Sequence, residues 1–302
     1  MPTISPTVTF AYIGTSKAGS TWLFNALAGH PEVYLGSDKG LYYFDSHFDQ
    51  GQQWYLDHFR GAGDGQAVGE ISHSYLSSPE APARIAEFNP DMRLLVCLRE
   101  PVDRAFSDYL DLVKNGQFDG PFPAALEQFP RLLDRGRYAT HLQRYLDVFP
   151  RGQLHVSLFD DLRTDPQAYA DEVFAFLGIR RLELPPADLK ARMPAGTPRN
   201  TAMTTAAKSM SKLAKQAGLR RLRSWVKRSV MVRQALYRPY TDDRPTIDPA
   251  VAAELRLGFA EEVLRLDSLL DRPVAATWGY SGSAGPAAAA DGSSSTAVWS
   301  GN

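Results

Sequence analysis

The sequence has a single cysteine, almost no net charge and no long apolar run, and each of these excludes a class of protein. Cys97, the one cysteine among 302 residues, has no partner for a disulfide, and its apolar neighbours predict a buried thiol. A formal net charge of −1 argues against a nucleic-acid-binding chain. The sequence has no apolar run of about 18 residues and no basic-then-apolar leader, which predicts a cytoplasmic protein without stable membrane insertion.

Short apolar runs alternate with segments of helical periodicity over residues 8–180. The apolar runs are rich in Val, Ile and Leu and have the length of buried strands. They lie at 8–13, 66–71, 93–98 and 153–159, with a weaker one at 32–35; the helical segments are 20–29, 79–88, 101–115, 139–149 and 166–177. This alternation predicts an α/β fold whose parallel strands are joined by helices and bind ligands at their carboxyl ends.

The C-terminal third departs from this alternation. From Leu189 to Thr241 there are thirteen Lys or Arg residues and no Asp or Glu. Residues 248–270 have the pattern of an amphipathic helix with Asp248 as its N-cap. The tail, 281–302, is rich in Ala, Gly and Ser, which predicts disorder. We therefore expect a single domain over 1–280, with a core at 8–180 and a basic helical or lid part at 189–280.

A glycine-rich turn, GTSKAGSTW (14–22), follows the first predicted strand. Its glycines have the spacing of a nucleotide-triphosphatase phosphate loop, but Ser20 stands where that loop has its lysine, and Lys17 lies inside the turn. The backbone N–H groups of such a turn, with the hydroxyls of Ser20 and Thr21, can bind an anion. Because a clear metal-binding aspartate is also missing from the strand ends, the turn indicates a metal-free anion site. A glycine-rich turn without a ligand is the alternative.

A second basic motif follows the strand at 93–98. Arg99 ends that strand, Pro101 opens the next helix, and Ser107 lies two turns into it. Arg99 could bind an anion bidentately with help from Ser107, whereas a surface ion pair between Arg99 and Asp103 is the alternative. Two anion sites at two strand ends suit a nucleotide that carries phosphates at both ends of its ribose.

Both motifs resemble those of the sulfotransferases that use 3′-phosphoadenosine 5′-phosphosulfate (PAPS). YIGTSKAGSTWL resembles their 5′-phosphosulfate loop, and CLREPVDRAFSDYL resembles their 3′-phosphate motif, Arg-[Asp/Glu]-Pro-x-x-Arg-x-x-Ser. The resemblance continues through DKGLYYFD, WYLDHF, GEISHSYL, GRYATHLQRYLDVFP and LHVSLFDDLRTDP, in the order found in heparan-sulfate-type enzymes and their bacterial relatives. It covers residues 8–180 and implies a P-loop-like three-layer core, no metal, and transfer of a sulfuryl group to a hydroxyl or, less favoured, an amine.

The resemblance also assigns roles to individual residues. Lys17 matches the lysine that contacts the phosphosulfate bridge, where it would neutralise charge on the departing phosphate oxygen of the product, PAP. Trp22 could flank the adenine, and Arg199 stands where a basic loop would begin to close over the nucleotide. The residues expected to bind the cofactor are Lys17, Ala18, Gly19, Ser20, Thr21, Trp22, Arg99, Ser107 and Arg199.

The general base is where this chain departs from the heparan-type pattern. Those enzymes have Lys-Glu before an aromatic pair, and the Glu is the base; here Lys39 is followed by Gly40. The next strand end offers His73, at the position of the histidine base of cytosolic sulfotransferases, and Glu70 as the second choice. An imidazole with the ordinary pKa near 6.5 would suit this role. A structural histidine is the alternative.

The acceptor is left open by the sequence. Lys39, Tyr43 and Phe44 are expected to bind it, and Tyr42 and Trp54 belong to the same aromatic cluster that could shape the pocket. A solvated lysine and packed core aromatics are the alternatives. The acceptor classes that suit the resemblance are small molecules of specialised metabolism, lipids and glycans. A small-molecule kinase or NTPase, and a PAP-binding module without catalysis, are the rival functions.

Overall fold

A five-stranded parallel sheet forms the centre of the protein. The structure is a computed structural model that describes residues 7–189, 196–198, 237–239 and 245–280. The strands are β1 (Phe10–Gly14), β2 (Val33–Leu35), β3 (Ala67–Ile71), β4 (Arg93–Leu98) and β5 (Leu154–Leu158). Their order in the sheet is β2-β3-β1-β4-β5, and every neighbouring pair is parallel. The central position of β1 brings its phosphate-loop motif next to the ends of both β3 and β4.

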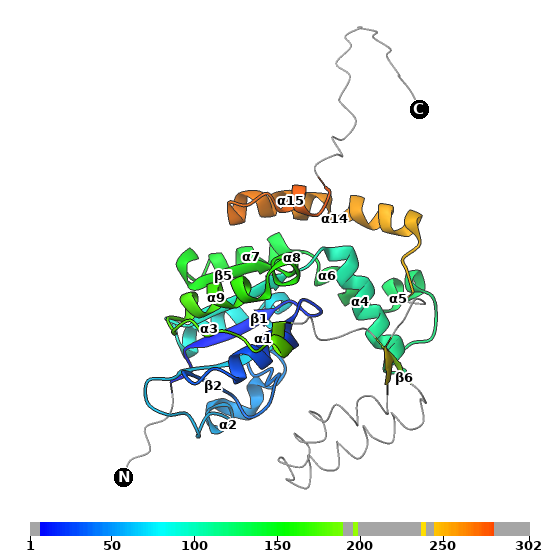
Figure 1. Ribbon diagram of the computed structural model, residues 1–302. Coiled ribbons are helices and arrows are strands. Elements are labelled where there is room, and N and C mark those ends of the chain that lie inside the picture. Colours follow the sequence, from blue (N-terminus) through cyan, green and yellow to red (C-terminus); the bar gives the residue numbers. More distant parts are fainter. Residues whose placement is uncertain (1–6, 190–195, 199–236, 240–244, 281–302) are drawn as a thin grey trace, which may run out of the picture.

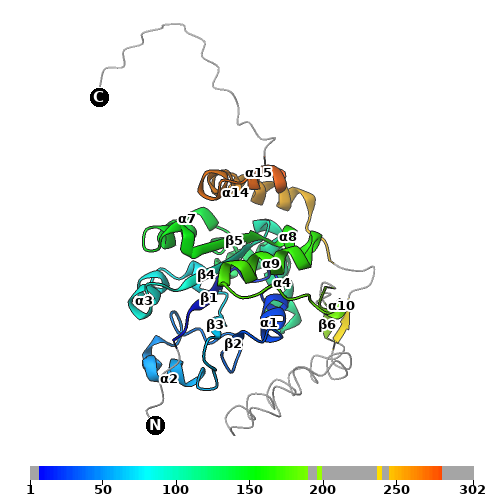
Figure 2. The same ribbon diagram turned by 60° about the vertical axis from the view of Figure 1, so that its left-hand side comes forward.

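Both faces of the sheet are covered by helices, as Figures 1 and 2 show. Alternate residues of one strand point to opposite faces, so Ala11 and Ile13 of β1 join one core cluster while Phe10 and Tyr12 join the other. The first cluster includes side chains of helices α3 (Ala81–Phe88) and α7 (Tyr138–Leu146), and the second includes those of α1 (Ser20–Ala28) and α9 (Pro166–Leu177). The three-layer α/β fold predicted from the sequence is confirmed.

The remaining helices complete the two layers and the sheet's carboxyl edge. Helix α4 (Pro101–Lys114) begins shortly after the end of β4. The shorter elements are α2 (Gly51–Asp57), α5 (Phe122–Gln128), α6 (Arg131–Asp134), α8 (Phe159–Thr164), α10 (Pro186–Leu189) and the 3₁₀ turns η1 (Phe48–Gln50), η2 (Tyr75–Ser77) and η3 (Arg151–Gln153). These short elements lack the long periodic pattern on which a sequence prediction depends, and none of them was predicted.

The C-terminal helices pack on the first core cluster. Helix α14 (Pro249–Leu270) begins at Asp248, whose carboxylate accepts hydrogen bonds from the N–H groups of Ala250 and Val251, as the predicted N-cap requires. Its buried side chains, and those of α15 (Val274–Thr277), lie in the same cluster as α7. Both helices lie beside α7 at the β5 end of the sheet in Figures 1 and 2.

Most of the basic segment predicted at 189–241 lies outside the described residues, as does the tail after Tyr280. Within the segment the structure describes only a two-stranded antiparallel pair, β6 (Gly196–Pro198) with β7 (Tyr237–Pro239). In the part of the chain that is described, no helix is long and apolar enough to span a bilayer.

Candidate active site

The predicted site residues follow four neighbouring strands at one edge of the sheet. Lys17 follows β1, Lys39 follows β2, His73 follows β3 and Arg99 follows β4. Because all of these strands are parallel, their carboxyl ends meet at this edge. The topology therefore brings together residues that are up to 82 positions apart in the chain.

The turn between β1 and α1 is shaped by residues with positive φ. Gly19 is the N-cap of α1 and has φ 84°, and Lys17 has φ 65°. A Cβ atom at Gly19 would lie 2.5 Å from Leu162 Cδ2, so this position requires glycine for both its conformation and its close packing. The turn delivers Ser20 and Thr21 to the N-terminus of the helix, where anions are favoured.

Two lysines converge on this turn. Lys39 Nζ lies 3.2 Å from Ser20 Oγ and 2.5 Å from Thr21 Oγ1, so it sits directly over the helix N-terminus. Burial, and then the positive charge of Lys17, lower the pKa of Lys39 to about 8. Lys17 in turn pairs with Asp111 of α4 at 3.3 Å. The Lys39 ammonium and two hydroxyls meet at a helix N-terminus within the field of the Lys17 charge, an arrangement that an anion would stabilise.

Arg99 connects the two predicted motifs. Its Nη1 donates a hydrogen bond to the carbonyl oxygen of Lys17 at 3.2 Å, across the β1–β4 pair. The guanidinium also lies over the ring of Phe159, at 5.2 Å from the centroid. Tyr138 Oη donates to the Arg99 carbonyl at 2.7 Å and so fixes the backbone of this strand end. Ser107 is half-buried on α4, two turns after Arg99.

A buried ion cluster supports the turn from behind. Arg104 is completely buried, and its Nη1 lies 3.5 Å from Ser16 Oγ and 3.4 Å from Asp108 Oδ2. The same Asp108 oxygen accepts from Arg135 at 3.2 Å. Arg104 also donates to the carbonyl of Leu132. Breaking such a buried pair leaves an uncompensated charge, so the cluster holds α4 and the turn in one arrangement.

His73 lies against Tyr42 at the end of β3. Its Nε2 is 2.8 Å from Tyr42 Oη, and the two rings meet edge to face with centroids 5.4 Å apart. Nδ1 of His73 is buried and has no hydrogen-bond partner among the described residues. Burial, followed by the positive charges of Arg135 and Lys39, lowers the pKa of His73 to about 4. The imidazole is therefore neutral at pH 7, well below the ordinary value assumed from the sequence.

Glu70 points into the core. Its side chain is 1% exposed, and its oxygens accept hydrogen bonds from Tyr55, Tyr75 and Ser72 at 2.9, 2.8 and 2.5 Å. Burial raises its pKa to about 7 although the three hydroxyls oppose this. With its acceptor positions filled by protein hydroxyls, Glu70 is placed to hold the strand end together. This geometry favours a structural role over that of the general base.

The residues on either side of α15 contact the ends of β4 and β5. Tyr280 Oη donates to Glu100 Oε1 at 2.7 Å, and the other oxygen of Glu100 caps α4 by accepting from Asp103 N at 2.6 Å. Trp278 Nε1 donates to Asp160 at 2.9 Å, and Arg272 forms two hydrogen bonds to Asp161 at 2.7 and 2.5 Å. The residue after Arg99 and the start of α8 are therefore both hydrogen-bonded to the C-terminal segment 272–280.

The comparison with protein families agrees with this geometry. A model of the sulfotransferase domain matches residues 11–237, which is most of the chain. The chain belongs to the sulfotransferase family. The sequence-based recognition of that family is thereby confirmed.

Relatives of this sulfotransferase include enzymes named for heparan sulfate. Human heparan sulfate glucosamine 3-O-sulfotransferase 3B1 is 32% identical over 180 residues, which cover 56% of this chain and 46% of that protein. A mouse bifunctional heparan sulfate N-deacetylase/N-sulfotransferase 4 is 30% identical over 194 residues and 22% of its length. This chain thus spans about half or less of the length of the curated relatives it matches. Among solved structures, a sulfotransferase from Alicyclobacillus acidocaldarius has a TM-score of 0.66 and 25% identity, over 90% of this chain and 98% of that one.

Three aromatic residues predicted to contact ligands are mostly packed inside the sulfotransferase. Tyr43 is 4% exposed and stacks on Tyr55 with centroids 4.5 Å apart, and Phe44 is completely buried among aromatic rings. Trp22 is 5% exposed and meets Tyr169 edge to face at 5.6 Å. These contacts support the core-packing alternative for Tyr43 and Phe44, and Trp22 is packed in the core as well. The half-buried member of the aromatic run is Tyr42, which the sequence placed only in the wider aromatic cluster.

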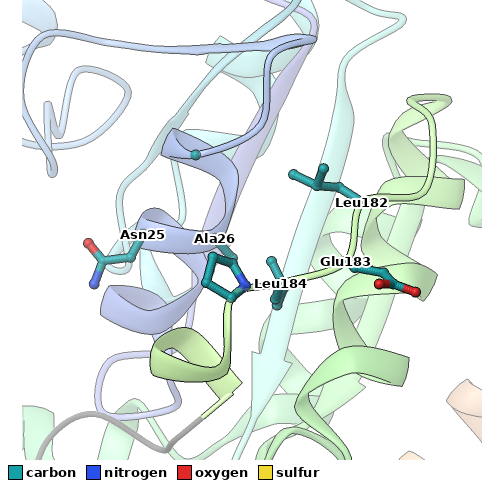
Figure 3. Close-up of a pocket in the computed structure, with 7 residues that line it drawn as sticks. Asn25, Ala26, Leu182, Glu183 and Leu184 are labelled. Carbon is teal, nitrogen blue, oxygen red and sulfur yellow. The ribbon is translucent and has the colours of Figure 1, made fainter.

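The predicted nucleotide-binding residues differ in how far the structure describes them. Ala18 is buried in the second core cluster, so its backbone alone could meet a ligand. Arg199 lies outside the described residues. A pocket of about 250 Å³, shown in Figure 3, is lined by residues of the C-terminal half of α1 and of 182–185. It lies away from Ser20, at the other end of α1, and none of the predicted site residues lines it.

Three charged residues of the site were missed by the sequence prediction. Asp108, Asp111 and Arg135 contact Ser16, Lys17 and Asp108, respectively. The spacing in the sequence could have revealed part of this cluster. Arg104, Asp108 and Asp111 are 4 and 3 residues apart, which places them on one face of a helix. Arg135 follows a short helix that has no predictive pattern, so only the structure could bring it to this place.

Proposed function

We propose that this sulfotransferase transfers the sulfuryl group of PAPS to a hydroxyl group of its acceptor. The hydrogen bond from Arg99 to the carbonyl of Lys17 is the observation that carries this proposal. It joins the two motifs that resemble the 5′- and 3′-phosphate sites into one continuous site. A nucleotide with phosphates on both sides of its ribose matches two cationic positions held together in this way.

The residues present suit such a cofactor. The 5′-phosphosulfate would lie at the N-terminus of α1, with the hydroxyls of Ser20 and Thr21 and the ammonium of Lys39 around it. The depressed pKa of Lys39 supports this arrangement, because an added anion would offset the repulsion from Lys17. Arg99 and Ser107 would bind the 3′-phosphate.

Lys17 and His73 would act on opposite sides of the sulfur. Lys17 would exchange its ion pair with Asp111 for the bridging oxygen of PAPS, where negative charge develops as the bond to sulfur breaks. His73, neutral at pH 7, would take the proton of the acceptor hydroxyl. Glu70 would position this strand end through Ser72 rather than accept a proton itself.

The acceptor that we propose to test first is the hydroxyl of a glycan. Support comes from the relatives, whose names specify heparan sulfate, although the chain matches less than half of their length. A small molecule or a lipid hydroxyl would suit the same chemistry. A kinase or NTPase is not favoured by any contact in the described site.

Binding of PAP without metal tests the cofactor assignment. At about 100 times its dissociation constant, PAP should stabilise the folded state by about 2.7 kcal/mol, because it binds only that state. We expect the melting temperature measured with EDTA to rise with PAP and to be the same with magnesium. An unchanged melting temperature, or a strict requirement for magnesium, would contradict the proposal.

Replacing Arg99 tests the 3′-phosphate site separately. Arg99→Ala should weaken PAP binding by about 2–5 kcal/mol, since a charged and partly desolvated partner is lost. Adenosine 5′-phosphosulfate lacks the 3′-phosphate, so its binding should weaken much less. Calorimetric titration of both ligands checks this, and equal weakening would show that Arg99 acts only through the Lys17 carbonyl.

A further inference from the structure

The base proposed for this enzyme is covered by another side chain. Nδ1 of His73 is buried, so Nε2 is the ring nitrogen that can exchange a proton with a ligand. Tyr42 Oη occupies the hydrogen-bonding position of that nitrogen at 2.8 Å. An acceptor hydroxyl must therefore either displace Tyr42 or pass its proton through it.

Tyr42 is held in place from its backbone. It has φ 52°, a left-handed conformation that is unfavourable for a bulky residue. Its N–H donates to Ser72 Oγ at 3.0 Å, and Ser72 donates to the buried carboxylate of Glu70. Because the backbone is fixed by a chain of bonds that ends in the core, displacing the ring is the less favourable of the two routes.

The phenol also fills the space above Gly40. A Cβ atom at Gly40 would lie 2.7 Å from Tyr42 Cε2 and 2.9 Å from Tyr42 Oη. Position 40 is where the resemblance to heparan-type enzymes would place a glutamate base. Glycine at this position and the tyrosine two residues later thus form one arrangement, in which the hydroxyl of Tyr42 occupies the space into which that side chain would extend.

We propose that Tyr42 relays the acceptor's proton to His73. The acceptor hydroxyl gives its proton to Tyr42 Oη while Tyr42 gives its own proton to His73 Nε2. The acceptor oxygen forms a bond to sulfur, and the bond from sulfur to the bridging phosphate oxygen breaks, leaving the electron pair on PAP. Tyr42 ends as a neutral phenol and His73 as an imidazolium. This inference rests on the proposed sulfuryl transfer.

The charges around the pair are consistent with a relay. Arg135, Lys39 and Asp108 are the charged groups that act on His73, and Asp45, Arg135 and Glu70 act on Tyr42. Burial, with Asp45, raises the pKa of Tyr42, so a free phenolate is unfavourable there. In a relay the two protons move together and the phenolate does not have to form.

The tautomer of His73 tests the relay without any acceptor. In the PAP complex of ¹⁵N-histidine-labelled protein, NMR should show His73 with its proton on Nδ1 and a free electron pair on Nε2, the pair that receives the Tyr42 proton. A proton on Nε2 at pH 7 would overturn the relay, because that nitrogen could then accept nothing. Failure of PAP to bind would instead contradict the proposed function, so the two failures are distinct.

Turnover provides the second test. PAP release from PAPS is measured with heparan sulfate and with water as the two acceptors. Tyr42→Phe should lower turnover at least about 30-fold while PAP affinity stays within about threefold. Tyr109→Phe is the matched control, since Tyr109 is also half-buried and donates one hydrogen bond, to Gly120 O, away from the site. Retention of more than a third of wild-type turnover by Tyr42→Phe would show that Tyr42 is displaced and does not relay the proton. If neither acceptor supports turnover, the tautomer measurement decides alone.

Discussion

At the scale of single residues, His73 combines burial with positively charged neighbours, and both favour the neutral imidazole. Arg135 and Lys39 act on it through space, while Asp108 opposes them. A histidine read from the sequence would titrate near 6.5. The structure moves its pKa down to about 4, and this changes the pH dependence to expect.

We predict that kcat/KM falls on the acid side only near pH 4 to 5, because the imidazolium formed below the pKa cannot accept a proton. In the PAPS complex the anion offsets nearby positive charge, so the acid limb of kcat should lie at higher pH than that of kcat/KM.

His73→Gln should lower turnover by about 10²–10⁴ and leave PAP binding intact. Turnover above a tenth of wild type in His73→Gln, as measured in the pH-rate profile, would rule out His73 as the base.

Glu70 shows the opposite perturbation. Its folded-state pKa of about 7 lies above the ordinary value near 4.5, so ionisation is disfavoured in the native protein. The contribution of Glu70 to the free energy of unfolding is therefore fully present below about pH 4.5 and is lost as the pH rises through 7.

Glu70→Gln should therefore remove a pH-dependent loss of stability. Relative to the variant, the wild type should lose up to about 3 kcal/mol of unfolding free energy between pH 4.5 and 8. Urea unfolding of both proteins at pH 5 and pH 8 measures this difference. Glu254→Gln, on an exposed position of α14, is the control and should show no such difference. If Glu70→Gln instead abolishes turnover while His73→Gln does not, Glu70 is the base.

At the scale of elements, the segment that follows α15 supports the start of α4. Tyr280 donates a buried hydrogen bond to Glu100, which caps α4 next to Arg99. Removing one partner of a hydrogen bond to a charged group leaves that group less well satisfied in the core. Tyr280→Phe should therefore affect both the stability of α4 and the anion site that Arg99 is expected to form.

For Tyr280→Phe we predict a loss of about 1–3 kcal/mol in unfolding free energy and a weakening of PAP binding of several fold. Thr277→Ala removes a hydrogen bond to Pro273 O within the exposed part of the same segment and is the matched control. Denaturant unfolding and calorimetric titration with PAP measure the two effects. Unchanged PAP affinity in a destabilised Tyr280→Phe would separate the C-terminal helices from the nucleotide site.

At the scale of the whole molecule, the C-terminal helices belong to the principal core. Phe259, Val263 and Leu266 of α14 and Val274 of α15 lie in the cluster that also covers one face of the sheet. These four residues lie beyond the match to the family model, which ends at residue 237. A division of the chain at residue 180 would therefore expose a large part of the apolar core.

A chain of residues 1–247 should accordingly show no cooperative thermal unfolding, whereas a chain of residues 1–280 should melt like the full protein. The reason is that each of the four buried side chains contributes about 1.5–3 kcal/mol by its removal from water, and the sum approaches the whole stability of a domain. Differential scanning calorimetry of both chains measures this. A cooperative transition in residues 1–247 would show that the core at 8–180 folds alone.

The sequence by itself determined the sheet, the family and the edge at which ligands are expected to bind. Five apolar runs predicted five strands, and all five are present as β1 to β5. Parallel strands bring the loops that follow them to one edge of the sheet. The sequence therefore predicted that Lys17, Lys39, His73 and Arg99 lie near that edge. The periodicity at 248–270 and its Asp248 cap likewise predicted α14.

Only the tertiary structure decided which side chains at that edge face the site. Tyr42, Tyr43 and Phe44 are three consecutive aromatic residues. The left-handed backbone at Tyr42 turns its ring toward His73, whereas the rings of Tyr43 and Phe44 enter the core. Glu70 and His73 are three residues apart, but Glu70 points inward to three hydroxyls, and its burial raises its pKa to about 7 although those hydrogen bonds oppose the shift. The pKa of His73 depends on Arg135, which is 62 positions away in the chain. Side-chain direction after a strand end and long-range charge depend on contacts between distant segments, so no local pattern of the sequence contains them.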